Sequence, residues 1–155
     1  MRDEDLELDE DGEEYLDNPD HDGGIRTALR VRFEDPAAAK AKYGPVASWD
    51  TSGITDMNRL FCDKEDFNED ISHWNVSNVV NMNGMFWDAA SFTGDLSSWD
   101  VGQVKYMRSM FDGATSFTHQ LGGAWATSTA DKRTLFYNSP GTIAGKTKGA
   151  GGTIA

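Results

Sequence analysis

The segment from Gly141 to Thr147 contains two glycines, a lysine and a threonine in an order close to that of a phosphate-binding loop. Such a loop holds phosphate groups with its backbone N–H groups and the lysine, and it needs four residues between its glycines. It also needs a buried strand before it and a helix after it. Here three residues separate Gly141 from Gly145, and three of the eight residues that follow Thr147 are glycine. The segment therefore does not predict nucleotide binding, and we expect no cofactor.

Part of a calcium-binding pattern lies near the N-terminus. The first half of an EF-hand loop has the spacing that is found here in Asn18, Asp20, Asp22 and Gly23. The position at which that loop requires a bidentate glutamate is Leu29, and no flanking pair of helices is evident. We therefore interpret the segment as part of a solvated acidic tail and expect no bound metal.

The sequence offers no nucleophile with an activating base. The histidines occupy unrelated places and, together with the single cysteine, do not reach a zinc-ligand spacing; they are His21, His73 and His119. Cys62 is predicted to be a partly exposed thiol with no base beside it. Because there is also no convincing pair of catalytic carboxylates, we expect that the protein is not an enzyme and has no catalytic residues.

Aspartates at two periodic positions permit two interpretations. They are Asp50 and Asp100 at the first position, and Asp70 and Asp95 at the second. Stacked calcium sites would need an acidic residue in every repeat, but Asn75 and Gln120 interrupt the two series. Such side chains more often accept hydrogen bonds from backbone N–H groups at turns. We therefore favour a structural role, which also explains Asn75 without the glycan that its Asn-Val-Ser pattern permits.

The elements that must position these residues repeat every 25 residues between Trp49 and Phe136. Large apolar residues recur in columns: Val46, Ile71, Leu96 and Leu121; Trp49, Trp74 and Trp99; Ile54, Val79 and Val104; Met57, Met82 and Met107; Phe61, Phe86, Phe111 and Phe136; and Phe67, Phe92 and Phe117. In the last repeat Trp125 lies one residue out of register. A fixed period of this length is typical of a solenoid, in which each unit buries its apolar side against its neighbours.

Each repeat is predicted to contain a short strand followed by a helix. Ile71, Trp74 and Val76 alternate roughly with polar residues, as in a strand. From Val79 to Phe86 the apolar residues follow the i, i+3, i+6, i+7 pattern of a two-turn helix. We therefore predict an α/β solenoid, a short leucine-rich-repeat-like array of strand–helix coils with a helical N-terminal cap.

Five segments follow one another along the chain. Residues 1–24 form an acidic tail that is predicted to be disordered, because like charges and few apolar residues leave little to bury. A helical N-terminal cap follows at 25–45, three 25-residue repeats at 46–123, a degenerate C-terminal cap repeat at 124–144, and a mobile Gly/Thr/Lys-rich tail at 145–155. Within the first cap, Asp35 and Pro36 are predicted to begin a second helix as N-cap and first residue.

The net charge of -12 is concentrated at the N-terminus. Residues 1–22 contain twelve acidic residues and one arginine, whereas the rest of the chain contains fourteen acidic and thirteen basic residues. No basic stripe of the kind that binds a phosphate backbone is present, so we expect no nucleic-acid partner. No apolar run approaches the roughly 18 residues of a membrane span. The single cysteine gives no sign of an oxidising compartment.

The repeat units resemble a known family. Two segments are similar to the BspA-type repeat of bacterial surface proteins and mycoplasma lipoproteins. The first, from Trp74 to Phe86, reads Trp-Asn-Val-Ser-Asn-Val-x-x-Met-x-x-Met-Phe, and the second, which begins at Ala89, reads Ala-x-x-Phe-x-x-Asp-Leu-Ser. This diverged leucine-rich repeat also occurs in protists and algae. The resemblance covers roughly residues 25–136, and it implies a non-enzymatic module for protein binding, adhesion or assembly, with no catalytic residues. The chain differs from the family in lacking a signal peptide and a lipid-anchoring cysteine near its start. The residues as written thus predict an intracellular protein and the resemblance implies the cell surface, so the compartment stays unknown.

Candidate binding residues lie where the repeat leaves the residue type free. Trp87 and Tyr137 share a variable column, and Tyr106 lies near Arg108 on the third repeat. Exposed aromatic residues and arginine are the usual anchors of protein interfaces. We therefore name these four as candidate interface residues. For Trp87 and Tyr137 the alternative is that they lie flat on neighbouring coils.

These features predict a non-catalytic protein-binding or scaffold module. We expect a small accessory subunit of a larger assembly, with other protein subunits as partners. The acidic tail is expected to contact a basic partner, which would make the association sensitive to salt. The alternative is a fragment of a cell-surface adhesion protein of the BspA type, and a third hypothesis is a metal- or nucleotide-binding protein.

Overall fold

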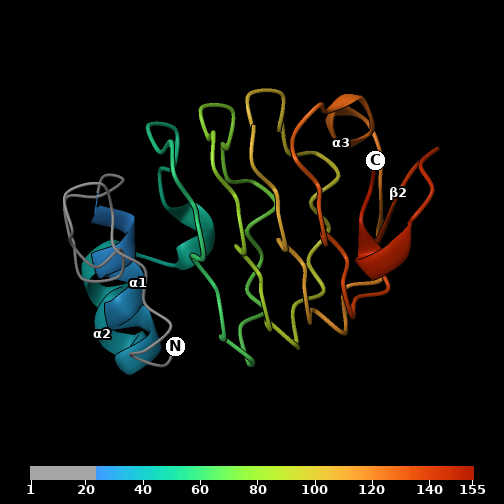
Figure 1. The fold of residues 1–155 in the computed structure, drawn as a ribbon. Helices are drawn as coiled ribbons and strands as arrows, with labels where there is room; N and C mark the ends of the chain where they lie inside the picture. The colour runs from blue at the N-terminus through green and yellow to red at the C-terminus, as the bar shows by residue number, and fades with distance from the viewer. Residues whose placement is uncertain (1–23) are drawn as a thin grey trace, which may run out of the picture.

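A computed structural model describes residues 24–155 of the chain (Figure 1). The predicted acidic tail and the calcium-loop spacing of Asn18 to Gly23 lie outside the described residues, apart from Gly24 at the end of the tail. The description begins with two helices, α1 (Ile25–Glu34) and α2 (Pro36–Tyr43), in the region where the sequence predicted them. The side chain of Asp35 accepts a hydrogen bond from the Ala38 N–H at 3.1 Å, and this N-cap begins α2.

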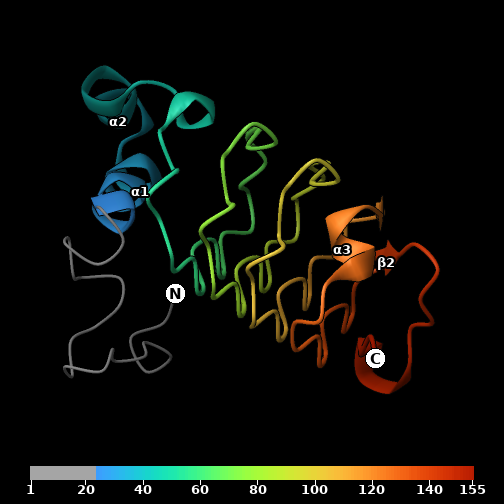
Figure 2. The ribbon, with the colours of Figure 1, turned by 90° about the horizontal axis from the view of Figure 1, so that it is seen from above.

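Helix α1 covers the first coil of the repeat region, at one end of the row of coils (Figure 2). The ring of Phe33 packs edge-on against Phe61 and Phe67, with centroid distances of 6.4 and 6.3 Å. The buried Arg26 lies with its Nη2 atom 3.6 Å from the Asp56 carboxylate. Apolar packing and an ion pair thus close this end of the array.

Residues 25 apart in the sequence lie side by side on consecutive coils (Figures 1 and 2). The rings of Phe61, Phe86, Phe111 and Phe136 are stacked, with successive centroid distances of 5.4, 5.5 and 5.5 Å. The second phenylalanine column, Phe67 to Phe117, is stacked beside it at 6.1 Å per step. The residues of both columns are buried, and the methionine column between coils is fully buried. The periodic apolar residues therefore form one continuous core.

Tryptophan side chains tie each coil to the one before it. The indole N–H of Trp74 donates to the Val46 carbonyl at 2.9 Å, and that of Trp99 donates to the Ile71 carbonyl at 3.1 Å. A short 3-10 helix, η3, spans Val46–Ser48, and the four-residue helix α3 spans Ala124–Thr127. Within α3, Trp125 donates to the Leu96 carbonyl at 2.9 Å. This tryptophan makes the same type of bond although it is out of register in the sequence.

The stretch from Val79 to Phe86 is not the helix that the spacing predicted but a series of turns. Every second N–H group donates to the carbonyl 24 residues later: Met82 to Tyr106, Gly84 to Arg108, Phe86 to Met110 and Asp88 to Asp112, at 2.7–2.9 Å. Gly84 and Asp88 have φ values of 61° and 58°, which interrupt a right-handed helix. A helix would direct its N–H groups along its own axis, whereas this backbone uses half of them to join the next coil.

Regular strands are equally sparse in the described chain. Parallel bridges join one residue per coil, Asp56 to Asn81, Asn81 to Tyr106 and Tyr106 to Asp131. The two named strands, β1 (Gln120–Leu121) and β2 (Thr142–Ile143), are parallel, with Gln120 opposite Thr142 and Leu121 opposite Ile143. In place of the strands predicted around Ile71 the chain has turns and irregular backbone, and helices and named strands are confined to the two ends of the described chain.

The C-terminal residues are packed against the last coil, so the prediction of a mobile tail at 145–155 was wrong. Ile154 is 3% exposed, and its N–H donates to the Lys132 carbonyl at 3.3 Å. The 3-10 helix η4 (Ala150–Gly152) places the Gly152 carbonyl 3.0 Å from the Phe136 N–H. Gly152 thus supplies an acceptor and Ile154 a donor to a coil that has no further coil beside it. Composition does not reveal such backbone pairing.

A candidate protein-binding face

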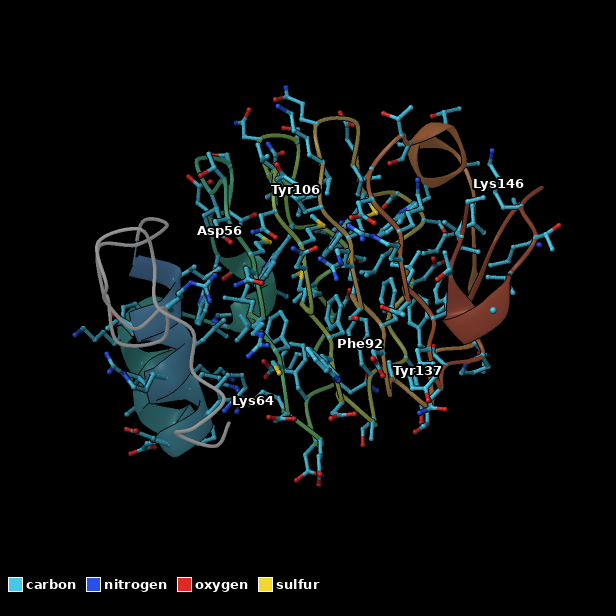
Figure 3. All side chains as sticks on the ribbon, viewed as in Figure 1. Asp56, Lys64, Phe92, Tyr106, Tyr137 and Lys146 are labelled. Atoms are coloured by element: carbon cyan, nitrogen blue, oxygen red, sulfur yellow. The ribbon has the colours of Figure 1, made fainter. Side chains whose placement is uncertain are left out.

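One face of the array carries the candidate interface residues. We define the turn face as the outward side chains of residues 55–63, 80–88, 105–113 and 130–138. In each of these segments the phenylalanine and the preceding Leu or Met are buried, as is the methionine of the first three segments and Lys132 in its place in the fourth, while the other positions are mostly half-buried or exposed. In Figure 3, Tyr106 lies in the upper half of the array and Tyr137 in the lower half, nearer the C-terminal end. The inter-coil hydrogen bonds hold the backbone of this face in a regular arrangement.

Tyr106 departs from a position that has a structural role in the other coils. There Asp56, Asn81 and Asp131 each accept a hydrogen bond from the N–H two residues later, at 2.7, 2.9 and 3.1 Å. Tyr106 cannot do so, and the Arg108 N–H donates instead to the Asn83 side chain of the preceding coil, at 2.7 Å. The tyrosine side chain is 46% exposed and Arg108 is exposed. The third coil thus carries an aromatic ring and a guanidinium at its surface.

Trp87 and Tyr137 occupy equivalent positions but have different environments. Trp87 is half-buried and lies against Arg59 of the preceding coil, whose Cζ atom is 5.2 Å from the ring centroid. The Trp87 ring thus has an arginine of the neighbouring coil over it and is less accessible to a partner than an exposed aromatic residue. Tyr137 is 47% exposed, so it is available to a partner.

Charges divide the turn face into two regions. Lys105, Arg108 and Arg133 lie in the third and fourth coils and are exposed. Arg133 donates two hydrogen bonds of 3.0 and 3.1 Å from Nε to the Asp131 carboxylate, and side-chain hydrogen bonding lowers the pKa of that carboxyl group. The positions seven residues after the bridge carry acidic residues in the first two coils, Asp63 and Asp88.

Asp112 is a partly buried carboxylate in the third coil, next to Asp88 of the second. Burial, followed by the negative charge of Asp88, raises the pKa of Asp112 to about 6. Within residues 24–155 no side-chain hydrogen bond or ion pair reaches its carboxylate. Sequence analysis did not select this residue, or Arg59. Comparing the four equivalent residues of each repeat column would have drawn attention to Asp112 and Arg59, because each differs from its equivalents.

The remaining chemically active side chains have structural environments. Cys62 is 5% exposed, so the prediction of a partly exposed thiol was wrong, and burial raises its pKa to about 12. The reason is that Cys62 packs beside the phenylalanine column and not in open solvent. His119 makes a 2.6 Å hydrogen bond between Nε2 and the Thr93 carbonyl. In the part of the chain that is described, no three His, Cys, Asp or Glu residues are grouped as a metal site would require.

The periodic aspartates stabilise turns. The Asp50, Asp70 and Asp95 carboxylates each accept hydrogen bonds from both the N–H and the hydroxyl of the serine two residues later, with N···O distances of 2.9–3.0 Å. These bonds lower the pKa of each carboxyl group. The Asn75 side chain accepts the same pair of bonds from Ser77, and Asp100 accepts one from the Gly102 N–H at 3.0 Å.

The segment from Gly141 to Thr147 has a structural role as well. Gly141 is buried, and a Cβ atom there would lie within 2.6 Å of the Phe136 ring. The N–H groups of Thr142 and Ala144 donate to the carbonyls of His119 and Leu121 at 3.1 and 2.8 Å. These groups are used to attach the segment to the preceding coil, so they do not form a cradle for phosphate.

Comparison with known proteins assigns a family. The chain belongs to the family described as "Mycoplasma protein of unknown function, DUF285", whose model matches residues 27–146. The match begins in α1 and extends past the last coil. Comparison with curated proteins and comparison with solved structures give no match. Among residues 24–155, no helix has the length and apolar character required to cross a membrane.

Proposed function

We propose that the protein is a non-catalytic binding or scaffold module that presents the turn face to another protein. The observation that carries this proposal is the exposure of both Tyr106 and Arg108: Tyr106 replaces the turn-stabilising residue of the other coils, and Arg108 stands where the first two coils have Asn58 and Asn83. Aromatic residues and arginine commonly supply most of the binding energy of an interface. The module would serve as a small accessory or structural subunit of a larger assembly.

We further propose that the array is a short solenoid related to the BspA-type repeat. This proposal is supported by the stacking of residues 25 apart and by the hydrogen bonds between consecutive coils. It implies the alternative function of cell-surface adhesion by a BspA-type fragment. An association with other subunits and an adhesive role both use a rigid non-catalytic surface, and they differ in where the partner resides.

The first test is the size of the native complex. The protein would be isolated from its source at low salt, and its complex would be sized by gel filtration and then again at high salt. We expect a mass well above 17.0 kDa that decreases as salt is raised, because charged contacts are screened. Recovery with the cell surface would favour the adhesion alternative. A monomer at both low and high salt would contradict both the subunit role and the adhesion alternative.

Variants then link the complex to the turn face. Replacement of Tyr106 and Arg108 by alanine should shift the protein from the complex to the monomer position. The matched control replaces Tyr43 and Lys42 of α2 by alanine, because this substitution also removes one tyrosine and one cation, with the Lys42 ammonium 5.3 Å from the Tyr43 ring centroid. A complex that survives the first double substitution would refute the assignment of the interface, provided that both variants retain a cooperative unfolding transition.

A further inference from the structure

The chain itself shows how the turn face holds a guanidinium group. Arg59 lies over the ring of Trp87, with 5.2 Å between Cζ and the ring centroid. A Cβ atom at Gly84 would be 3.3 Å from both the Arg59 Cγ and the Trp87 Cε3 atoms, so the absence of a side chain at Gly84 leaves room for the pair. A cation over an indole ring is attracted by the negative face of the ring. The first and second coils thus contain an internal arginine–aromatic pair.

The same arrangement recurs two coils later with its arginine replaced. Each residue of the first place has an equivalent 50 residues later in the sequence. Ser109 replaces Arg59, Tyr137 replaces Trp87, Asp112 replaces Cys62 and Thr134 replaces Gly84. The backbone is equivalent, because φ is 56° at Arg59 and 55° at Ser109. The hydrogen bond from the Asp63 N–H to the Trp87 carbonyl and that from the Gly113 N–H to the Tyr137 carbonyl are both 2.8 Å.

The groups at this second place are those that bind a cation. The ring of Tyr137 is 47% exposed, and the Asp112 carboxylate lies in the adjacent coil. The hydroxyl oxygens of Ser109 and Thr134 are 2.7 Å apart. Within residues 24–155 no cation stacks on Tyr137, and no ion pair reaches Asp112. Asp112 and Tyr137 are equivalent residues of adjacent coils, and the hydrogen-bonded Ser109 and Thr134 occupy the positions that Arg59 and Gly84 have beside Trp87. The Thr134 hydroxyl also lies 2.7 Å from the Arg133 carbonyl, to which it donates.

We propose that Ser109, Asp112, Thr134 and Tyr137 form a cation seat for an arginine side chain of a partner protein. This deepens the binding role proposed above and rests on it. The guanidinium would stack on Tyr137 as Arg59 stacks on Trp87, and it would donate hydrogen bonds to the Asp112 carboxylate. It would also offset the repulsion between Asp112 and Asp88. Arginine suits the seat better than lysine because its planar group can stack and donate at the same time.

The test uses a pair of ligands that differ only in charge. N-acetyl-L-arginine methylamide and its neutral citrulline isostere would be titrated into the full chain labelled with ¹⁵N. The amide signals of Gly113 and Tyr137 would report the seat separately from the acidic residues 1–22. We expect the arginine probe to shift these signals with a Kd about tenfold lower than that of the citrulline probe.

Three variants assign the interaction to the seat. Asp112→Asn and Tyr137→Ala should each weaken arginine binding by about fivefold. Ser109→Arg should abolish it, because the new arginine would occupy the seat in the way that Arg59 occupies the equivalent place. The controls Asp100→Asn, at an exposed turn where Asn75 is the equivalent residue, and Tyr43→Ala on α2 should leave the affinity unchanged. Amide spectra of each variant show whether it is folded.

Two results would overturn the proposal. One is equal affinity for the arginine and citrulline probes, and the other is unchanged arginine affinity in the folded Asp112→Asn and Tyr137→Ala variants. Either result, obtained while the native complex still depends on Tyr106 and Arg108, would remove the seat and leave the proposed binding function intact. The reverse result is a seat that binds the arginine probe specifically in a protein whose complex does not depend on Tyr106 and Arg108. It would retain the cation seat and reject the proposed binding function.

Discussion

Replacing Asp112 by asparagine should stabilise the protein at neutral pH and have little effect in acid. The carboxyl group has a pKa of about 6 in the folded protein, raised from its ordinary value of 3.8 by burial and then by the charge of Asp88. Between these pKa values the folded state binds more protons than the unfolded state. Stability therefore falls as the pH rises from about 4 to about 6, and the loss is complete above that range.

The magnitude follows from the shift and from the exposure of the group. A shift of about two pKa units corresponds to about 3 kcal/mol as an upper limit. Asp112 is only partly buried, so solvent screening reduces the expected effect to about 1 kcal/mol. Asparagine keeps the shape of the side chain and removes its charge. The variant should therefore be about 1 kcal/mol more stable than the natural protein at pH 7.5 and equal to it near pH 4.

Urea unfolding followed by tryptophan fluorescence at several pH values between 4 and 7.5 measures this difference. The control is Asp95→Asn, because hydrogen bonds from Ser97 lower the pKa of Asp95. A carboxylate with a lowered pKa adds stability above its unfolded pKa and loses it as the pH falls. At pH 7.5 the change in the free energy of unfolding should therefore be positive for Asp112→Asn and negative for Asp95→Asn. A stability difference for Asp112→Asn that does not change between pH 4 and pH 7.5 would refute the reasoning.

Three further predictions concern the core and its ends. Phe86→Ala should destabilise the protein by about 3–5 kcal/mol in urea unfolding, because the ring is fully buried and stacked between coils; a loss below about 1 kcal/mol would contradict this. Gly152→Ala should cost about 1–3 kcal/mol, because φ is 71° and a Cβ atom would clash with the backbone of Phe136. Its control, Gly53→Ala, meets no atom within 4 Å and should be nearly neutral in the same assay. Cys62 should react with a thiol reagent at pH 8 only after unfolding, because burial raises its pKa to about 12, and rapid labelling of the folded protein would argue against this burial.

The columns of large apolar residues determine much of the core by themselves. The tryptophan, methionine and phenylalanine columns were predicted to face inward, and apart from the half-buried Trp49 their side chains are buried. The turn-stabilising role of the aspartates also follows from local sequence, because Asp70 and Ser72 are two residues apart and need no distant partner. The positions of α1 and α2 depend on similarly local signals, such as the N-cap at Asp35.

The backbone conformation of the repeat depends on residues that are distant in sequence. Apolar spacings of three and four residues place side chains on one side in a helix and also in a series of turns, so periodicity does not separate the two. A helix and a series of turns differ in which carbonyl groups accept hydrogen bonds from the backbone N–H groups. For the Met82 N–H the acceptor is the Tyr106 carbonyl. The local pattern around Val79 therefore predicted a helix that the structure replaces with turns.

The equivalence of residues 25 apart can be inferred from the amino-acid sequence, since equivalent core positions require the same apolar residue types. What covers the end of the array and what surrounds each variable residue depend on the folded arrangement of the coils. The C-terminal glycines carry no apolar signal, but the backbone carbonyl of Gly152 accepts a hydrogen bond from the Phe136 N–H of the last coil. Trp87 and Tyr137 are equivalent in the repeat, yet one is covered by Arg59 and the other is exposed. This difference arises because a surface side chain responds to the adjacent coil, and that neighbour lies beside it only after the chain has folded.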